Sequence, residues 1–160
     1  NLVEVYELIK SDKYKQATSE LRALSDVKEA RLFKARSFDY VTFSGTFASR
    51  HDSNLITSSG LLTIDLDHLT NLDGVINLLL NDPKIETELL FTSPSGDGLK
   101  WIVPIYYNDL THDEYFEAVK NYLDDAYNLK IDASGKNFSR ACFLPHDPNI
   151  YINPKYLSNE

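Results

Sequence analysis

The order of hydrophobic patterns between residues 60 and 145 limits this chain to few folds. Four segments are rich in β-branched and aromatic residues and have the length of strands. These predicted strands span 60–66, 86–92, 99–106 and 140–145. Apolar residues every three to four positions, together with capping signals, predict helices over 70–80 and 113–127. The order is therefore strand, helix, strand, strand, helix, strand.

That order is a split β-α-β-β-α-β arrangement, so the sequence predicts an α+β fold with a ferredoxin-like or RRM-like core. Amphipathic segments before it predict a helical N-terminal part over residues 1–38, followed by a strand over 40–47. A chain of 160 residues is the size of one domain with a substantial core. We therefore expect a single domain over 1–160, whose core over 40–155 carries an N-terminal helical and strand extension.

Composition and charge exclude several classes of protein. The chain has no apolar run of the roughly 18 residues that a membrane span needs. Its formal net charge of −8 argues against a protein that coats nucleic acid by charge alone. The one cysteine, Cys142, can form no internal disulfide and fits a reducing compartment, so we expect a cytoplasmic protein. The start at Asn1 and the lack of methionine suggest a piece excised from a longer polypeptide.

The first strand of the predicted core ends on two carboxylates, Asp65 and Asp67, in the stretch SGLLTIDLDHL. Alternate side chains of a strand share a face, so both should project together while Leu66 points to the other face. Carboxylates this close disfavour each other's ionisation, and a divalent cation removes that cost. A chain this rich in aspartate contains a D-x-D pair by chance, so the metal-site interpretation depends on the position at the strand end.

The loop SPSGDG between the second and third core strands is a second candidate. Its glycines allow a tight turn and leave backbone amides able to face an anion. Lys100 begins the outgoing strand, where its ammonium could reach a phosphate. A plain β-hairpin with Asp97-Gly98 in the turn explains the same residues. In the expected fold, however, this hairpin lies close to the end of the aspartate strand.

The stretch KIDASGKNFSRACFLPHD is the third candidate. Asp132 follows an apolar residue, and Arg140 begins the last predicted strand. A third carboxylate and a planar guanidinium are the groups that a phosphoryl-transfer site would still need. The alternative interpretation places Asp132 in a turn and Arg140 in a surface ion pair.

Several other side chains are interpreted as structural. Trp101 and Phe91 could stack on a base, but strand aromatics more often belong to the core, and Cys142 is expected there too. Basic residues recur on the third helical segment, which we interpret as a solvated helix face. These are Lys28, Arg31, Lys34 and Arg36.

In their order, these stretches resemble the archaeo-eukaryotic primase superfamily of primase-polymerases, and most closely its VirE N-terminal family. The matching motifs are D-L-D, then S-P-S-G-D-G-L-K, then I-D followed by S-R-A-C-F-L-P, and the resemblance covers roughly residues 40–155. It implies that three carboxylates are catalytic and bind Mg²⁺ or Mn²⁺, namely Asp65, Asp67 and Asp132. The residues that it implies for nucleotide binding are Ser95, Gly96, Lys100 and Arg140. Lys100 stands where the family commonly has a histidine, a departure that keeps a phosphate-binding cation.

The activity that the resemblance implies is nucleotidyl transfer by two metal ions, in the replication of mobile elements or phages. The substrates would be nucleoside triphosphates and a single-stranded or primed nucleic acid. A helicase-like ATPase domain in the same chain is the expected partner. The alternative is a non-catalytic nucleotide-binding or nucleic-acid-binding module attached to such an ATPase. A nucleotide cyclase is disfavoured because the central hairpin supplies only Asp97 as a second acid.

Overall fold

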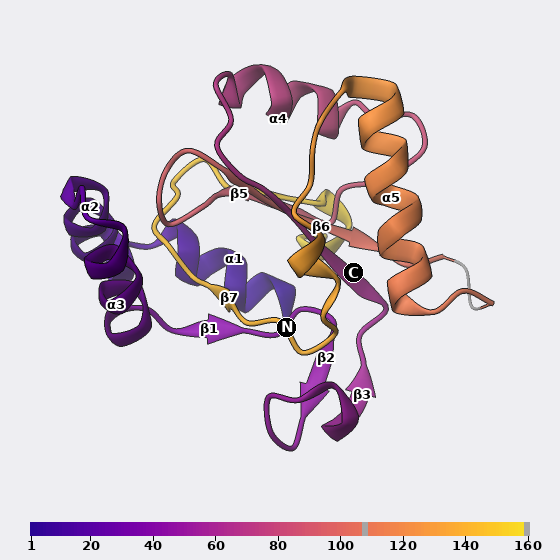
Figure 1. Cartoon of the computed structure of the whole chain (residues 1–160), viewed down its shortest axis with the longest axis horizontal. Helices are drawn as coiled ribbons and strands as arrows, with labels where there is room; N and C mark the ends of the chain where they lie inside the picture. The colour runs from indigo at the N-terminus through magenta and orange to yellow at the C-terminus, as the bar shows by residue number, and fades with distance from the viewer. Residues whose placement is uncertain (107–108, 159–160) are drawn as a thin grey trace.

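In the described part of the chain, a four-stranded antiparallel sheet lies at the centre of the structure (Figure 1). The structure is a computed structural model, and it describes residues 1–106 and 109–158. The strands, in spatial order, are β4 (Leu61–Leu66), β6 (Leu99–Pro104), β5 (Leu89–Thr92) and β8 (Tyr151–Ile152). The pairing places Asp65 of β4 and Phe91 of β5 on either side of Lys100 of β6. The predicted α+β class is confirmed.

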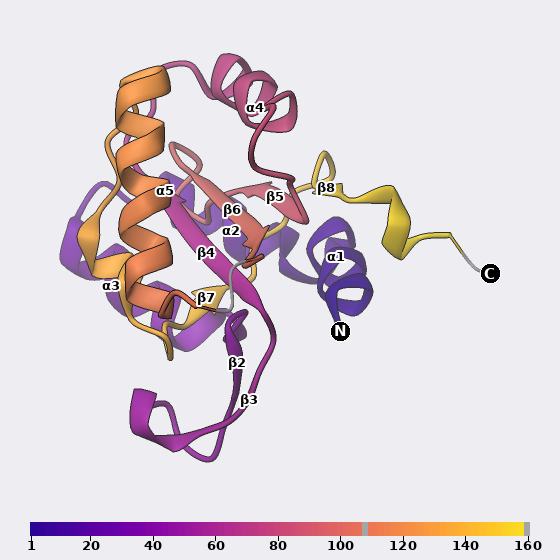
Figure 2. The ribbon, with the colours of Figure 1, turned by 90° about the vertical axis from the view of Figure 1, so that its right-hand side faces the viewer.

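Helices α4 (Leu72–Leu80) and α5 (His112–Tyr127) cover one face of this sheet (Figures 1 and 2). Trp101 is fully buried between them and the sheet, and its Nε1–H donates a hydrogen bond to Thr87 Oγ1 at 2.8 Å. Burying an indole requires such a partner for its N–H. The prediction that Trp101 belongs to the core is therefore confirmed.

The starts of these helices follow from local hydrogen bonds. Thr111 and Glu114 form the predicted capping box of α5, each side chain bonded to the other's backbone N–H. Helix α4 begins at Leu72, two residues after the start of the predicted range 70–80. The Asn71 side chain, rather than that of Thr70, accepts a hydrogen bond from the Gly74 N–H. Asparagine is the stronger cap of the two residues, which accounts for the difference.

The N-terminal helices pack on the opposite face of the sheet. They are α1 (Leu2–Lys10), α2 (Lys15–Ala23) and α3 (Val27–Ser37), close to the three helical segments expected. A second apolar core on this side contains Ile9, Phe91 and Cys142. Burial raises the pKa of the Cys142 thiol to about 12, so this cysteine is a structural one, as predicted.

The segment 140–145, predicted as the last strand of the sheet, is placed differently. Within this segment, only Cys142–Phe143 forms a strand, β7. It pairs with β1 (Tyr40–Val41) in a separate two-stranded sheet. The fourth position is taken by β8, which lies beside β5. The prediction that residues 140–145 form the last strand of the sheet is wrong. The backbone of β7 pairs instead with β1, a segment about 100 residues earlier in the sequence. The RRM-like arrangement as a whole stays a prediction.

The predicted strand over 40–47 is interrupted. After β1, strand β2 (Gly45–Phe47) pairs with β3 (Leu55–Ser58) to form an arm that projects from the body of the molecule (Figure 2). No side chain of β3 is buried. Within the described residues, no helix is both long enough and apolar enough to span a membrane.

The loop between β5 and β6 packs against the end of β4, as the sequence predicted. The Leu69 N–H donates to Asp97 O at 2.8 Å, and the Ser93 N–H donates to Gly98 O at 2.8 Å. A Cβ on Gly98 would lie 2.5 Å from Leu66 O, so only glycine allows this approach. The loop therefore holds Lys100 beside the aspartate strand.

Candidate functional site

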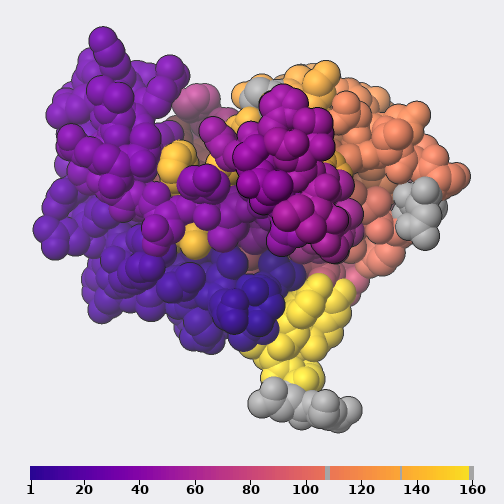
Figure 3. Space-filling model, turned by 90° about the horizontal axis from the view of Figure 1, so that it is seen from below, coloured from indigo at the N-terminus to yellow at the C-terminus, as the bar shows by residue number. Residues whose placement is uncertain are grey.

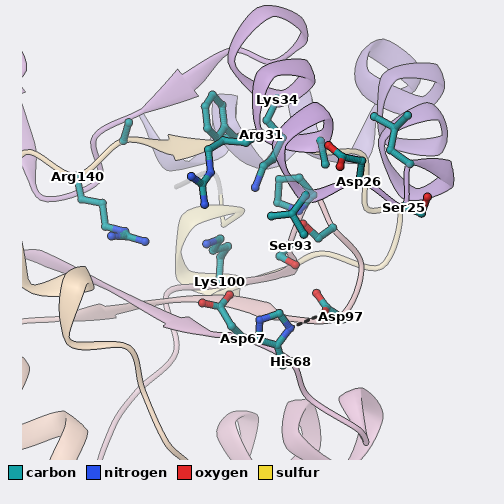
Figure 4. Close-up of a pocket in the computed structure, with 17 residues that line it drawn as sticks. Ser25, Asp26, Arg31, Lys34, Asp67, His68, Ser93, Asp97, Lys100 and Arg140 are labelled. Carbon is teal, nitrogen blue, oxygen red and sulfur yellow. Dashed lines mark hydrogen bonds and ion pairs between the residues drawn. The ribbon is translucent and has the colours of Figure 1, made fainter.

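A cavity of about 650 Å³ opens between α3, the β5–β6 loop and the segment that precedes β7. Cationic side chains from all around the cavity point into it (Figure 4). They are Arg31 and Lys34 of α3, Lys100 of β6, and Arg140. Because these residues come from distant parts of the chain, the cavity exists only in the folded protein.

Asp65 lies behind the cavity and holds two of these cations. Its Oδ1 lies 2.8 Å from Lys100 Nζ, and its Oδ2 lies 2.8 Å from Arg140 Nη2. The carboxylate is 2 % exposed and is not part of the cavity lining, so the two cations stand between it and the open space. Among the described residues neither oxygen accepts a hydrogen bond of ordinary geometry, so these contacts act through charge.

The charge of Asp65 decides the ionisation of Lys100. Burial by itself would lower the pKa of this lysine, but the negative charge of Asp65 outweighs burial, so the pKa is raised. Lys100 is therefore a fixed cation at neutral pH. Removing one partner of a buried ion pair leaves an uncompensated charge, so Lys100 and Asp65 depend on each other in this position.

Lys34 shows that positive charge is crowded in the cavity. Burial and the neighbouring charges of Lys100 and Arg31 lower the pKa of its ammonium, and Asp67 offsets them only in part. A bound anion would relieve this repulsion. The cavity is therefore electrostatically prepared for a negatively charged ligand.

The carboxylates of the rim are largely engaged within the protein. Asp26 caps α3 by accepting a hydrogen bond from the Glu29 N–H at 2.7 Å. Asp97 Oδ2 lies 2.9 Å from His68 Nδ1. Asp67 is exposed after the end of β4, lines the cavity and points toward Lys100 (Figure 4). Asp67 is thus the rim carboxylate placed closest to where a ligand would meet the cations.

The two predicted loop residues have different places. Ser95 lines the cavity, whereas Gly96 does not. Gly96 has a φ of +87°, and a Cβ there would lie 2.8 Å from Arg22 Nε. Arg22 donates hydrogen bonds to the carbonyls of Pro94 at 3.1 Å and Ser93 at 3.2 Å. Gly96 therefore makes room for an arginine of α2 that holds the loop in shape.

The three predicted metal ligands have different surroundings. Asp65 is engaged by cations, Asp67 lies on the rim, and Asp132 is exposed before the 3-10 turn Ala133–Lys136 and does not line the cavity. In the described ranges no group of three or more His, Cys, Asp or Glu side chains could hold a metal ion. The binding of Mg²⁺ or Mn²⁺ therefore stays a prediction.

Sequence analysis missed the contribution of α3. Arg31 and Lys34 were interpreted as part of a solvated face, but both line the cavity. Their spacing of three residues places them on one side of a helix, which was a usable signal. What the sequence does not reveal is that this side faces Lys100 and Arg140.

Comparison with known proteins gives one match. The family profile of the BT4734-like N-terminal domain matches residues 33–152, which include Lys34, Lys100 and Arg140. The predicted membership of the VirE N-terminal family is therefore wrong, and nothing in the comparisons supports the primase superfamily. The short motifs behind that resemblance do not single out a family. No curated protein and no solved structure matches the chain.

The ion pair between Asp65 and Lys100 can be measured by a double-mutant cycle. We expect Lys100→Met to lower the free energy of unfolding by up to about 3–5 kcal/mol, because it leaves the buried carboxylate with Arg140 alone. The double variant Asp65→Asn/Lys100→Met should recover part of this loss, giving a coupling energy of about 1–3 kcal/mol in urea unfolding.

The matched control is the half-buried pair of Lys120 and Glu117 on the surface of α5, whose charged atoms are 3.2 Å apart. Its coupling energy should be about 0.5 kcal/mol or less. Equal coupling energies for the two pairs would contradict the structural role assigned to Asp65.

Proposed function

The chain belongs to the BT4734-like N-terminal domain family, and we propose that its cavity binds the phosphate groups of a nucleoside triphosphate. The observation that carries this proposal is the convergence of Arg31, Lys34, Lys100 and Arg140 on one cavity. Arginine offers a planar pair of donors to phosphate oxygens, and lysine offers a compact charge. Together they suit a polyphosphate better than a singly charged ligand.

The remaining lining fits the rest of a nucleotide. Leu24, Val27 and Ala30 form an apolar wall on the helical side, and Pro94 and Phe143 lie elsewhere in the lining. Apolar and aromatic side chains with a few converging polar groups are typical of small-molecule sites, and a volume of about 650 Å³ is in the usual range. We assign the phosphates to the cations and the base to this apolar wall.

A second candidate function is nucleotidyl transfer from the bound triphosphate to a nucleic acid, the activity of a primase-polymerase. The position of Asp65 and Asp67 beside the phosphate-binding cations favours it. A divalent ion, when bound, would neutralise charge on the phosphates. Because the described carboxylates form no ready metal site, nucleotide binding in this proposal does not depend on a metal.

The biological role, the partner, the cellular location and the RRM-like core are also proposals. A role in the replication of mobile elements, a helicase-like ATPase as partner and a cytoplasmic location all remain proposals, the last supported by the single buried cysteine. An RRM-like core is supported by the antiparallel order β4-β6-β5, in which the third strand of the unit lies between the first and second.

Nucleotide binding is tested by isothermal titration calorimetry with ATP, with and without Mg²⁺. We expect Lys34→Gln to weaken binding by about 10- to 100-fold, because it removes one charge-assisted contact to phosphate. The affinity should also fall as salt is added. Lys28→Gln is the matched control, since Lys28 is an exposed lysine of the same helix outside the cavity. Equal affinities for both variants and the unchanged chain would contradict the proposal.

Nucleotidyl transfer is tested by incorporation of labelled nucleotides on a single-stranded template with Mg²⁺ or Mn²⁺, with and without a primer. If the second candidate is correct, Asp67→Asn should reduce the rate of nucleotide incorporation by at least about 100-fold. This is the order of magnitude expected when a group that stabilises the transition state is lost. Binding of ATP should persist in that variant. The absence of incorporation by the unchanged chain, together with normal ATP binding, would leave the first function and reject the second.

A further inference from the structure

A second cavity adjoins the first on the other side of Arg140. Its volume is about 460 Å³, and it shares Arg140 and Ala141 with the first cavity. The other contributions come from Arg50, His51 and Asp52 in the connection of the β2–β3 arm and from the segment before β7. The two cavities are therefore neighbouring parts of one surface.

An aromatic pair lies on the β1–β7 ribbon beside Arg140. Tyr40 and Phe143 are directly opposite each other in the ladder, with their rings edge-to-face at 6.4 Å between centroids. Phe143 lines the first cavity, and Tyr40 is 52 % exposed. The guanidinium of Arg50 lies 5.8 Å from the centre of the Tyr40 ring. The ribbon thus carries an exposed ring with a cation next to it.

One carboxylate in the second cavity is already used within the protein. Asp52 Oδ1 accepts a hydrogen bond from the Ser139 N–H at 2.7 Å, which ties the arm to the segment before β7. Hydrogen bonds from Ser139 lower the pKa of this carboxyl. Asp52 therefore fixes the wall of the cavity, which Arg50 and Arg140 also line.

We infer that a single-stranded nucleic acid lies across the β1–β7 ribbon, with a base stacked on Tyr40 and phosphates on Arg50 and Arg140. Exposed aromatic rings interleaved with cations are the means by which proteins bind single strands. A duplex keeps its bases paired and stacked internally, so it could not use the ring. The inference rests on the proposed function, because the strand would lead past Arg140 to the nucleotide cavity.

The shape of this face agrees with such a path. In Figure 3 the β2–β3 arm stands out over the middle of the face, and gold atoms from the later part of the chain are exposed between it and the N-terminal helices. A strand that followed the two cavities would pass between the arm and α3. Its phosphates would meet positive charge in a protein whose net charge is −8, so contact would be confined to this surface.

The test measures fluorescence anisotropy of a labelled oligothymidylate single strand with the 160-residue chain. Tyr40→Leu should weaken binding by about 5- to 100-fold, whereas Tyr40→Phe should bind as the unchanged chain does. Arg50→Gln should reduce the slope of log affinity against log salt by about 0.7, the value for one phosphate contact on a single strand. Tyr40→Leu and Arg50→Gln should bind ATP normally in calorimetry.

Matched controls are Tyr106→Leu and Arg36→Gln, which change exposed residues outside both cavities. Both should bind the single strand normally. The inference would be overturned if the unchanged chain bound ATP but no single strand, if Tyr40→Leu bound like the controls, or if a duplex bound equally well. If the unchanged chain did not bind ATP, the proposed function would be overturned instead.

Discussion

The carboxylate of Asp65 is the charge around which the candidate site is organised. It lies buried at the end of β4, with Lys100 and Arg140 each 2.8 Å from one of its oxygens. Burying a carboxylate is costly unless cations compensate it, so the fold must bring β6 and the segment before β7 to this point. The same contacts leave both cations facing the cavity. Asp65 therefore acts on a ligand through the groups that it positions.

Helix α3 forms the wall of the cavity opposite Lys100 and Arg140. By adding Arg31 and Lys34, it surrounds the open space with positive charge, and burial together with the charges of Lys100 and Arg31 lowers the pKa of Lys34. The protein as a whole is acidic, so an anion would be attracted only where these side chains concentrate the field. The region matched by the family profile begins within α3 and includes Lys34.

Local structure could be predicted from the sequence, and long-range placement could not. The capping box of α5 and the packing of the SPSGDG loop against β4 depend on neighbours in sequence or on one hairpin, and both were predicted. The pairing of β7 with β1 and the direction in which α3 faces depend on contacts about 100 residues apart. The D-x-D pattern singled out Asp65 but did not reveal that Lys100 and Arg140 lie against its two oxygens.

The most direct test of this account is a crystal structure of the chain with a non-hydrolysable nucleoside triphosphate. The account predicts that the phosphates lie within hydrogen-bond distance of Lys34, Lys100 and Arg140, with the base against the apolar wall of Leu24 and Val27. A nucleotide bound elsewhere, with the cavity between α3 and β6 containing only solvent, would contradict it.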